Sequence, residues 1–342
     1  MRILKELIAK LAEGKSLSLE EAYSSCITML KGDYDPIEAS ALLMGLRVKG
    51  EASQEFQGFL KALEENVIHI NTTKKVIDIV GTGGDRLNTI NASTLASIVV
   101  ASMGIPVAKH GNRGFSSLFG SADFMEAVGY PIEHNASIAS KLIDSVSFTF
   151  LYAPQYHLAL KNIAPVRKKL GIRTIFNMVA PLINPARPTA QIIGTPNEKT
   201  ANIISNALTG FSKRKYAIVT GYPGMDEVSP VGPTRVIIMK DSLQEEIIIH
   251  PKDLGLQEIP IESIIGKTKE EILKKDLEGL KGKDHAASIF IALNSGLTLY
   301  LIDEVRSIHE GFKKSLNQIK EGLAWRKLNE IVSEARRLVD IG

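Results

Sequence analysis

Short apolar runs alternate with helical patterns between Lys75 and His250, and this alternation limits the fold more than any other feature of the chain. Strands that alternate with helices form a mainly parallel sheet with helices on its faces, which is the α/β class. The expected strands are Val76–Val80, Ile105–Ala108, Phe148–Tyr152, Ala190–Ile193, Tyr216–Thr220, Arg235–Lys240 and Glu246–His250. The expected intervening helices are Thr94–Met103, Ser121–Val128, Ala136–Ser145, His157–Leu170 and Lys199–Leu208.

Both ends of the chain are predicted to be helical only. Ser18 and Glu21 form a capping-box pattern, and Asp35-Pro36 combines an N-cap with proline at the first helical position. A further helix is expected over Ser53–Asn66. The last seventy-odd residues predict four more helices, Lys269–Leu280, Ala286–Leu301, Ser307–Lys320 and Ala324–Val339. A chain of 342 residues accommodates one large and one small domain, and no internal repeat or Pro/Gly/Ser linker interrupts it.

Composition excludes several classes of protein. Hydrophobic residues make up 44% and charged residues 23%, and 41 basic against 38 acidic side chains leave a net charge of +3. This near balance gives no global electrostatic reason to bind nucleic acid or a membrane. Cys26 is the single cysteine, so it has no intrachain disulfide partner, and a charged amphipathic start does not resemble a signal peptide. We therefore expect a cytoplasmic protein.

The segment Gly81-Thr82-Gly83-Gly84-Asp85 follows the first expected strand and precedes a helix. Glycines at such a turn let backbone N–H groups approach an anion, and the helix N-terminus adds a favourable dipole. The spacing fits neither a Walker loop nor a Rossmann fingerprint. Thr89–Thr94 follows closely; its hydroxyls and amide either cap the next helix or donate to a pyrophosphate, and both uses are compatible.

The segment Lys109-His110-Gly111-Asn112-Arg113 follows the second expected strand. It places a cation, an imidazole, an amide and a guanidinium within five residues. Lys109 is a point charge suited to phosphate, and Gly111 and Gly114 permit close backbone approach. A solvated charged loop is the alternative. Together the two segments predict a site for a highly phosphorylated small molecule.

Four ordered motifs then resemble the anthranilate phosphoribosyltransferase family of tryptophan biosynthesis. They are Gly81–Asp85 with Thr89–Thr94, Lys109–Ser117 with Gly120–Asp123, Val166–Asn177 with Ala180–Pro185, and Gly224–Ser229. The resemblance covers essentially the whole chain. It implies a small helical domain over residues 1–72, with a mid-chain helical piece at about 157–182, beside a large α/β domain over 73–342 of the nucleoside phosphorylase/phosphoribosyltransferase type.

The resemblance also implies an activity: Mg²⁺-dependent transfer of 5-phosphoribose from phosphoribosyl pyrophosphate (PRPP) to the amine of anthranilate, with release of pyrophosphate. The resemblance also implies a homodimer joined through the helical domain, the usual assembly in this family. The implied donor-binding residues are Gly81, Gly84, Asp85, Thr89, Asn91, Ala92, Ser93, Thr94, Lys109, His110, Gly111, Asn112, Arg113, Gly114, Phe115, Ser116, Ser117 and Ser121. The implied metal ligands are Ser93, Asp226 and Glu227, and the implied acceptor residues are Gly81, Asn112, His157, Arg167 and Pro181.

Residue chemistry agrees with these assignments. Carboxylate oxygens such as those of Asp226 and Glu227 suit Mg²⁺, which neutralises a leaving pyrophosphate. The planar fork of Arg167 is suited to a carboxylate. Taken alone, each has an ordinary alternative: a solvated acidic pair, an exposed basic helix, and for His157 a plain helix-end residue. No general base is assigned, because the acceptor amine is already nucleophilic at neutral pH.

Three residues depart from the family pattern. Arg86 and Ala180 stand where glycine is usual, and Phe119 replaces a serine. Arg86 either reaches pyrophosphate or obstructs the loop if its backbone needs a positive φ. These departures keep open a second hypothesis, a transferase or phosphorylase-like enzyme with another acceptor. A third, a non-enzymatic relative that binds nucleic acid, would require the cationic excess that this chain lacks.

Overall fold

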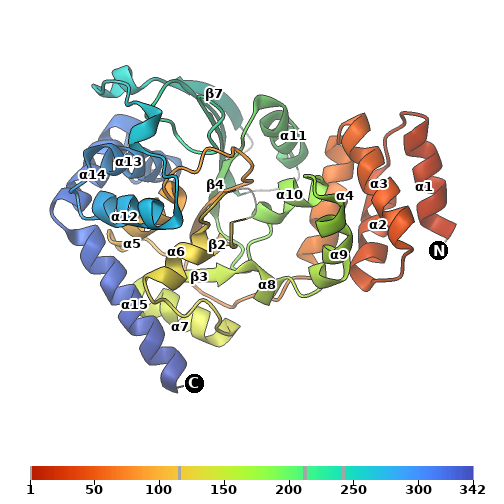
Figure 1. Cartoon of the computed structure of the whole chain (residues 1–342), viewed down its shortest axis with the longest axis horizontal. Helices are drawn as coiled ribbons and strands as arrows, with labels where there is room; N and C mark the ends of the chain where they lie inside the picture. The colour runs from red at the N-terminus through yellow and green to blue at the C-terminus, as the bar shows by residue number, and fades with distance from the viewer. Residues whose placement is uncertain (1, 115–116, 211–213, 241–242, 342) are drawn as a thin grey trace.

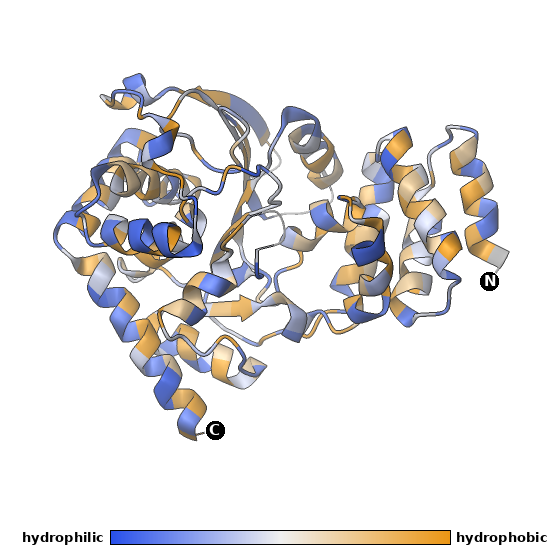
Figure 2. Cartoon of the chain, viewed as in Figure 1, coloured by the Kyte–Doolittle hydropathy of each residue, from blue (hydrophilic) through white to orange (hydrophobic). Residues whose placement is uncertain are grey.

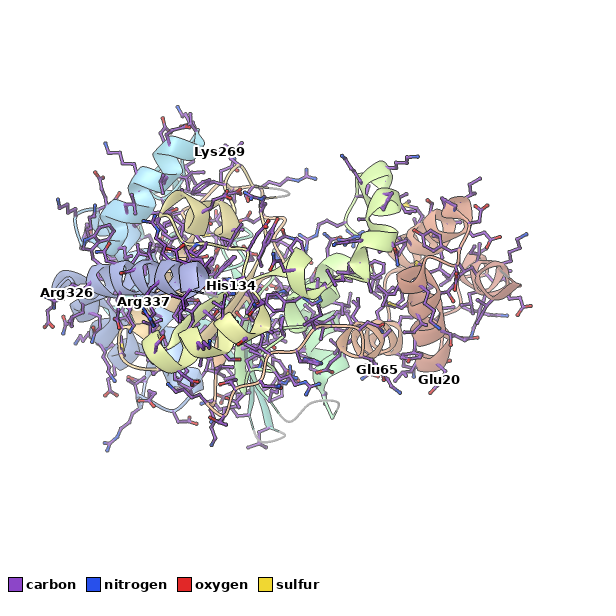
Figure 3. All side chains as sticks on the ribbon, turned by 90° about the horizontal axis from the view of Figure 1, so that it is seen from below. Glu20, Glu65, His134, Lys269, Arg326 and Arg337 are labelled. Atoms are coloured by element: carbon purple, nitrogen blue, oxygen red, sulfur yellow. The ribbon has the colours of Figure 1, made fainter. Side chains whose placement is uncertain are left out.

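The computed structural model describes residues 2–114, 117–210, 214–240 and 243–341, in which a small helical part stands beside a larger α/β part. The N-terminus lies in the helical part, and the chain ends on the long helix α15 at the opposite side of the molecule (Figure 1). Seen from below, Glu20 and Glu65 lie at the helical end, and Arg326 and Arg337 lie along α15 at the other (Figure 3). The predicted fold class is confirmed.

Four helices open the chain: α1 (Arg2–Ala12), α2 (Leu19–Lys31), α3 (Pro36–Lys49) and α4 (Ser53–Glu64). Ser18 and Glu21 form the predicted capping box of α2, and Asp35 accepts the N–H of Ile37 to cap α3. Gly32 and Gly50 stand just beyond the C-termini of α2 and α3 with positive φ, where a side chain would be strained. These local signals explain why the four helices could be predicted closely.

Mid-chain helices pack against this N-terminal group. They are α8 (Ala153–Tyr156), α9 (Leu160–Leu170), α10 (Ile175–Val179) and the 3₁₀ turn η1 (Ala180–Leu182). Helix α9 contacts α2 and α3, and α10 contacts α4. The rings of Phe59 and Phe176 meet edge to face with centroids 5.3 Å apart. The helix that was expected to begin at His157 begins at Leu160, because His157 (φ −109°, ψ 56°) interrupts helical geometry after α8.

Seven strands form one sheet in the order β3-β2-β1-β4-β5-β6-β7. Their bounds are β1 (Ile77–Gly81), β2 (Val107–Gly111), β3 (Phe148–Tyr152), β4 (Ala190–Gly194), β5 (Lys215–Gly221), β6 (Thr234–Lys240) and β7 (Leu243–Ile249). Strands β1 to β5 pair in parallel, and β6 and β7 complete the sheet in antiparallel fashion. Strand β7 begins earlier than predicted because its first residues, from Leu243 on, are exposed, so that cross-strand pairing with β6 defines them and burial does not.

Successive residues of a strand pack into two different hydrophobic cores. Ile192 joins the core beneath the C-terminal helices, and its neighbour Ile193 joins the other core, which continues into the helical part. Buried strands with both faces covered are typical of parallel sheets. Since one core runs without interruption from the sheet into α2 and α4, the two parts of the chain pack closely.

The remaining helices cover the sheet. They are α5 (Ala92–Ala101), α6 (Ser121–Ala127), α7 (Ala136–Val146), α11 (Glu198–Leu208), α12 (Lys269–Leu280), α13 (His285–Leu301), α14 (Ile308–Lys320) and α15 (Leu323–Ile341), with the 3₁₀ turns η2 (Pro251–Leu254) and η3 (Ile261–Ser263). Helix α5 contacts β1, β2 and α13. Helix α15 alternates hydrophobic and hydrophilic residues, as expected of a helix with one buried face (Figure 2). None of the described helices combines the length and the apolar character needed to cross a bilayer.

We predict that Gly58→Ala destabilises the helical part. A Cβ at Gly58 would stand 2.5 Å from the backbone oxygen of Leu19 and 2.7 Å from the Cβ of Ala22, so α2 and α4 would have to separate. We expect the free energy of unfolding to fall by about 1–2 kcal/mol, as overpacking outweighs the gain in helix propensity. Gln54→Ala, an exposed position of the same helix, is the control and should change it by about 0.5 kcal/mol or less. Equal values for the two variants in chemical denaturation would contradict the close crossing.

Candidate active site

The candidate site lies where the parallel strands end. Strands β1 and β4 finish in register at Gly81 and Gly194, and β2 and β3 finish in register at Gly111 and Tyr152. In open α/β sheets ligands bind beyond the carboxyl ends of the strands. Both glycine-containing segments from the sequence therefore emerge at the same edge of the sheet.

The loop after β1 is held by two long-range contacts. The N–H of Gly83 donates to Oδ2 of Asp226 at 2.8 Å, and the guanidinium of Arg173 donates to the carbonyls of Thr82 (3.0 Å) and Gly83. Cβ atoms added at Gly81 or Gly84 would collide with Asp226 or with Arg173. The glycines are thus required by close approach as well as by the turn. Arg173 belongs to the Val166–Asn177 motif, but the sequence analysis gave it no role at the site.

Arg86 has a φ of +59°, and Asn88 follows with +54°. A non-glycine residue in this left-handed region costs about 1–2 kcal/mol, so the positive φ considered from the sequence is present and Arg86 tolerates it. Its side chain is exposed. The possibility that it reaches pyrophosphate stays a prediction.

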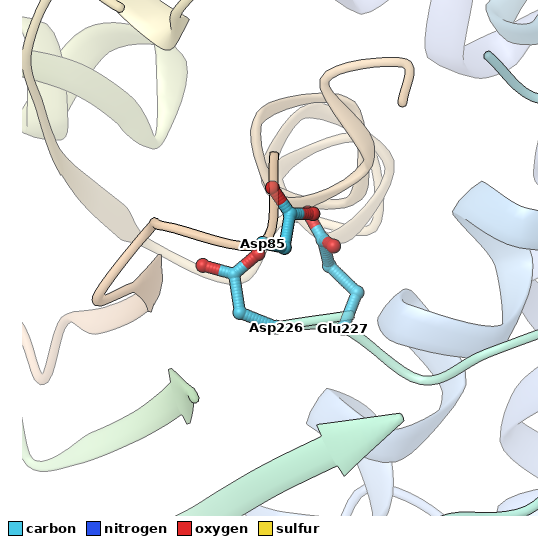
Figure 4. A group of neighbouring side chains, drawn as sticks. All are labelled: Asp85, Asp226 and Glu227. Atoms are coloured by element: carbon cyan, nitrogen blue, oxygen red, sulfur yellow. The ribbon is translucent and has the colours of Figure 1, made fainter. Parts of the chain in front are cut away.

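Three carboxylates converge beside this loop. Asp85, Asp226 and Glu227 each offer an oxygen within 4.8 Å of the others (Figure 4). Burial and the neighbouring charge of Asp226 raise the pKa of Asp85 to about 6, and burial with both aspartates raises the pKa of Glu227 well above its usual value. Oε2 of Glu227 is buried and has no hydrogen-bond partner among the described residues.

This donor set fits a hard divalent cation. Carboxylate oxygens are the protein ligands of Mg²⁺, and a cation would remove the repulsion and occupy the unpaired Glu227 oxygen. The structure thus adds Asp85, expected among the donor-binding residues, to the expected pair Asp226 and Glu227. Ser93 is the second residue of α5, and its role as a metal ligand stays a prediction.

Lys109 is buried on β2, where Nζ donates to the carbonyl of His110 at 2.9 Å. Burial lowers the pKa of Lys109, and the charges of Asp78, Glu227 and Asp226 oppose the shift. Asp78 itself is fully buried in β1 and accepts hydrogen bonds from the His110 N–H (3.1 Å) and from the amides of Asn184 (2.9 Å) and Gln191 (3.3 Å). The neighbouring carboxyl groups therefore favour the charged form of Lys109 at the site.

The sequence already carried one sign of the hydrogen-bond network around Asp78. Asp78 interrupts the otherwise apolar run Val76–Val80. A carboxylate inside a buried strand requires hydrogen-bonding or cationic partners, and its position alone could have marked it as a support for the site.

His110 and His157 form a buried pair. Their Nε2 atoms lie 3.0 Å apart, and their ring centroids 5.0 Å. Burial lowers the pKa of both imidazoles, that of His157 to about 4. Both rings are therefore neutral at pH 7, in opposite tautomers, with one N–H donating to the other ring. The pair connects the end of β2 to the residue after α8.

The segment after His110 was expected to bind the donor, but acidic residues of α6 already engage part of it. The guanidinium of Arg113 binds both oxygens of Glu126 (2.7 and 3.1 Å) and one of Asp123 (3.2 Å), so acids of α6 already engage this predicted donor residue. Asp123 also accepts the N–H groups of Gly114 (3.0 Å) and Gly120 (2.9 Å). Phe115 and Ser116 lie outside the described residues. Ser117 is half-buried within the same turn.

Asn112 closes this loop onto α6. Its carbonyl accepts the N–H of Ala122 (3.1 Å) and the hydroxyl of Ser121 (3.2 Å), and no hydrogen bond of the described residues uses its Nδ2. Phe119 is buried in the core under the C-terminal helices, so it does not replace a hydroxyl at the loop surface. Ala180 has ordinary right-handed helical angles and tolerates its methyl group without backbone strain.

The segment leading into α5 is anchored from the opposite side. Thr89 forms an isolated β-bridge with Ile265, and Asn91 donates both its backbone N–H and its amide to Asp276, each at 2.8 Å. Ala92 starts α5, and Oγ1 of Thr94 is buried and unpaired among the described residues. Asp276 is a second supporting residue that sequence reasoning missed, since 185 positions separate it from Asn91.

The expected acceptor residues come from separate elements. Arg167 lies half-buried on α9 with its guanidinium 5.3 Å from the ring centre of Phe176, and no carboxylate among the described residues pairs with it. Burial lowers its pKa. Pro181 is buried in η1, and its carbonyl accepts the amide of Gln191 at 3.4 Å. The guanidinium of Arg167, which has no carboxylate partner among the described residues, is therefore available to a carboxylate ligand.

Fold and site define a two-domain glycosyl transferase. The model of a glycosyl transferase family, α/β domain, matches residues 73–325, and that of its helical bundle domain matches residues 5–67. The anthranilate phosphoribosyltransferase of Pyrobaculum calidifontis is 41% identical over 333 residues, which cover 97% of this chain and 99% of that protein. This chain belongs to the anthranilate phosphoribosyltransferase family.

Solved structures agree. The crystal structure of anthranilate phosphoribosyltransferase from Thermus thermophilus has a TM-score of 0.87 and 32% identity, covering 96% of this chain and 99% of the other. Two structures of the Saccharomyces cerevisiae enzyme, one in complex with PRPP and Mg and one with 4-fluoroanthranilate, each have a TM-score of 0.86. Their identities are 27% and 26%, and both cover 98% of each chain.

We predict that the metal-free protein loses stability as the pH rises through about 6. The folded state raises the pKa of Asp85 from 3.8 to about 6, so between these values the folded protein binds the proton more tightly than the unfolded chain and stability falls with rising pH. Thermal unfolding in chelator should show this slope in the wild type and a smaller one in Asp85→Asn. The exposed Asp253→Asn is the control.

Added Mg²⁺ should raise the unfolding temperature more at pH 7.5 than at pH 5, because protons compete for the same carboxylates. Identical pH dependence of wild type and Asp85→Asn, with no response to Mg²⁺, would exclude the cluster as a cation site.

Proposed function

We propose that this protein transfers the 5-phosphoribosyl group of PRPP to the amine of anthranilate, giving N-(5-phosphoribosyl)anthranilate and pyrophosphate. The observation that carries the proposal is the convergence of Asp85, Asp226 and Glu227 on the glycine loop at the carboxyl edge of the sheet. A polyanionic donor needs both backbone N–H groups and a cation, and this arrangement supplies the loop and the ligands for the cation.

The donor is assigned to the edge formed by the ends of β1 and β2 and the start of α5. Lys109 brings positive charge to this edge, and the N-terminus of α5 adds its dipole. Asp226 and Glu227 would hold Mg²⁺ with the support of Asp85 and Ser93. When bound, the metal stabilises the negative charge that develops on the departing pyrophosphate.

The acceptor is assigned to the side formed by Arg167, Asn112, His157, Gly81 and Pro181. The guanidinium of Arg167 would bind the anthranilate carboxylate through its planar fork. Because His110 and His157 are neutral, their rings would contribute shape and hydrogen bonding, and Arg167 would provide the positive charge. Ala180 lies in η1 beside Pro181 and fits there without strain.

The protein's contribution to the chemistry is alignment and electrostatic stabilisation. A substitution with oxocarbenium-like character at the anomeric carbon gains most from an oriented amine and a stabilised leaving group. No residue is assigned as general base, since proton loss from the amine follows its attack. The near-neutral net charge of +3 gives no support to nucleic-acid binding.

We infer a division into a helical domain, residues 1–72 with the piece at about 157–182, and an α/β domain over 73–342. We also infer a homodimer formed through the helical domain. Ile37, Met44 and Val48 lie seven and four positions apart on α3, so they share one face, and Ile37 and Val48 are 79% and 78% exposed. Such a face on a helix is typical of an interface. A cytoplasmic location remains a prediction from Cys26 and the N-terminal pattern.

Purified protein with PRPP and Mg²⁺ should extinguish the fluorescence of anthranilate and release pyrophosphate. Chelation of the metal should abolish both changes. Binding of PRPP without any loss of anthranilate would instead indicate a different acceptor.

Arg167→Ala should raise KM for anthranilate by about tenfold or more, with KM for PRPP little changed, because a charge-assisted bond to the carboxylate is lost. Lys168→Ala, on the exposed side of the same helix, is the control and should behave as wild type. An unaltered KM for anthranilate in Arg167→Ala would show that Arg167 does not bind the anthranilate carboxylate.

For the dimer, Ile37→Asp combined with Val48→Asp should yield a monomer in light scattering, because two charges would be placed in an apolar contact. Leu243→Asp changes a residue of similar exposure, 77%, on β7 and should leave the mass unchanged. A wild-type protein that is already monomeric at micromolar concentration would refute the assembly.

A further inference from the structure

Asn91 occupies the N-cap position of α5, yet its side chain makes no hydrogen bond to the helix. Asparagine at this position ordinarily accepts the N–H of the second or third helical residue. Two other asparagines of this chain do so: Asn135 accepts from Ile138 in α7, and Asn197 accepts from Thr200 in α11. Among the asparagine N-caps of the described helices, Asn91 thus differs from the other two.

The Asn91 side chain is hydrogen-bonded to Asp276 instead. One carboxylate oxygen accepts the backbone N–H of Asn91 and the other accepts its Nδ2, each at 2.8 Å. Asp276 lies on α12 and is 0% exposed, and no cation forms an ion pair with it among the described residues. Burial raises its pKa to about 7. A buried carboxylate without a cation is costly for folding, so stability alone does not account for it.

The consequence is an open helix end. The N–H of Thr94 donates to the carbonyl of Asn91 at 3.0 Å, whereas the N–H of Ser93 has no partner among the described residues. Oγ1 of Thr94 is buried and likewise unpaired. If Asn91 capped α5 in the ordinary way, its side-chain oxygen would occupy this position and compete with any anion.

We propose that Asp276 is a positioning residue that holds the Asn91 side chain away from the first turn of α5 and so keeps the Ser93 N–H free for a phosphate of the donor. The inference rests on the proposed donor site. Asp276 touches no substrate; it acts through Asn91, from an element that follows the whole sheet in the chain. Loss of its carboxylate lets Asn91 close the helix end.

Asp276→Leu removes both acceptors while keeping the branching of the side chain, and Asp276→Ala removes both without adding volume. In both variants we expect KM for PRPP, and its calorimetric Kd, to rise about tenfold, while KM for anthranilate and kcat stay within about threefold. Lys274→Leu, exposed on the same helix, is the control. If Asp276→Leu does not fold, as judged by thermal unfolding, the result for Asp276→Ala tests the proposal.

Addition of Asn91→Ala separates positioning from a purely structural role. In the Asp276→Leu background it removes the competing side chain, so PRPP affinity should improve or stay constant. In the wild type the same change breaks the amide bond to Asp276 that anchors the start of α5, so PRPP affinity should weaken. Additive losses in the double variant, or unchanged PRPP affinity in a folded Asp276 variant, would overturn the proposal. A wild type that binds PRPP but does not consume anthranilate would refute the proposed acceptor and leave this role of Asp276 intact.

Discussion

The site depends on how closely the connection after β5 approaches the loop after β1. The Gly83 N–H reaches Asp226 at 2.8 Å, and neither Gly81 nor Gly194 could carry a Cβ without colliding with that residue. This single contact fixes the acidic pair at the mouth of the glycine loop. Two segments that are more than 140 residues apart in the chain thereby become one site.

Electrostatic balance at this edge is maintained by burial as much as by pairing. Asp85, Asp226 and Glu227 repel one another, and Lys109 lies between them and Asp78, which is held in turn by the amides of Asn184 and Gln191. Such a network is costly when incomplete, because a low dielectric strengthens both attraction and repulsion. Under the proposed function, a cation and a polyanionic donor would complete this network together.

Much of the fold was predictable because its signals are local. Capping at Ser18 and Asp35, the alternation of strands and helices, and the glycines at strand ends each depend on a few neighbouring residues. The boundaries moved where tertiary contacts act: β7 is extended by pairing with β6, and the helix expected from His157 is broken where that residue turns toward His110. Arg173, Asp78 and Asp276 support the site through partners far away in sequence, and patterns of adjacent residues do not reveal such partners.

The sequence by itself determined the α/β class, the helical ends and the segments that carry the chemistry, because hydrophobic periodicity, caps and glycines act over one or two turns of chain. Only the tertiary structure decided that Asp85 joins Asp226 and Glu227, that Arg113 is engaged by Asp123 and Glu126, and that Asn91 turns from its own helix to Asp276. These are contacts between side chains on different elements. Their geometry depends on how the sheet and its helices pack, which the local pattern of residues does not specify.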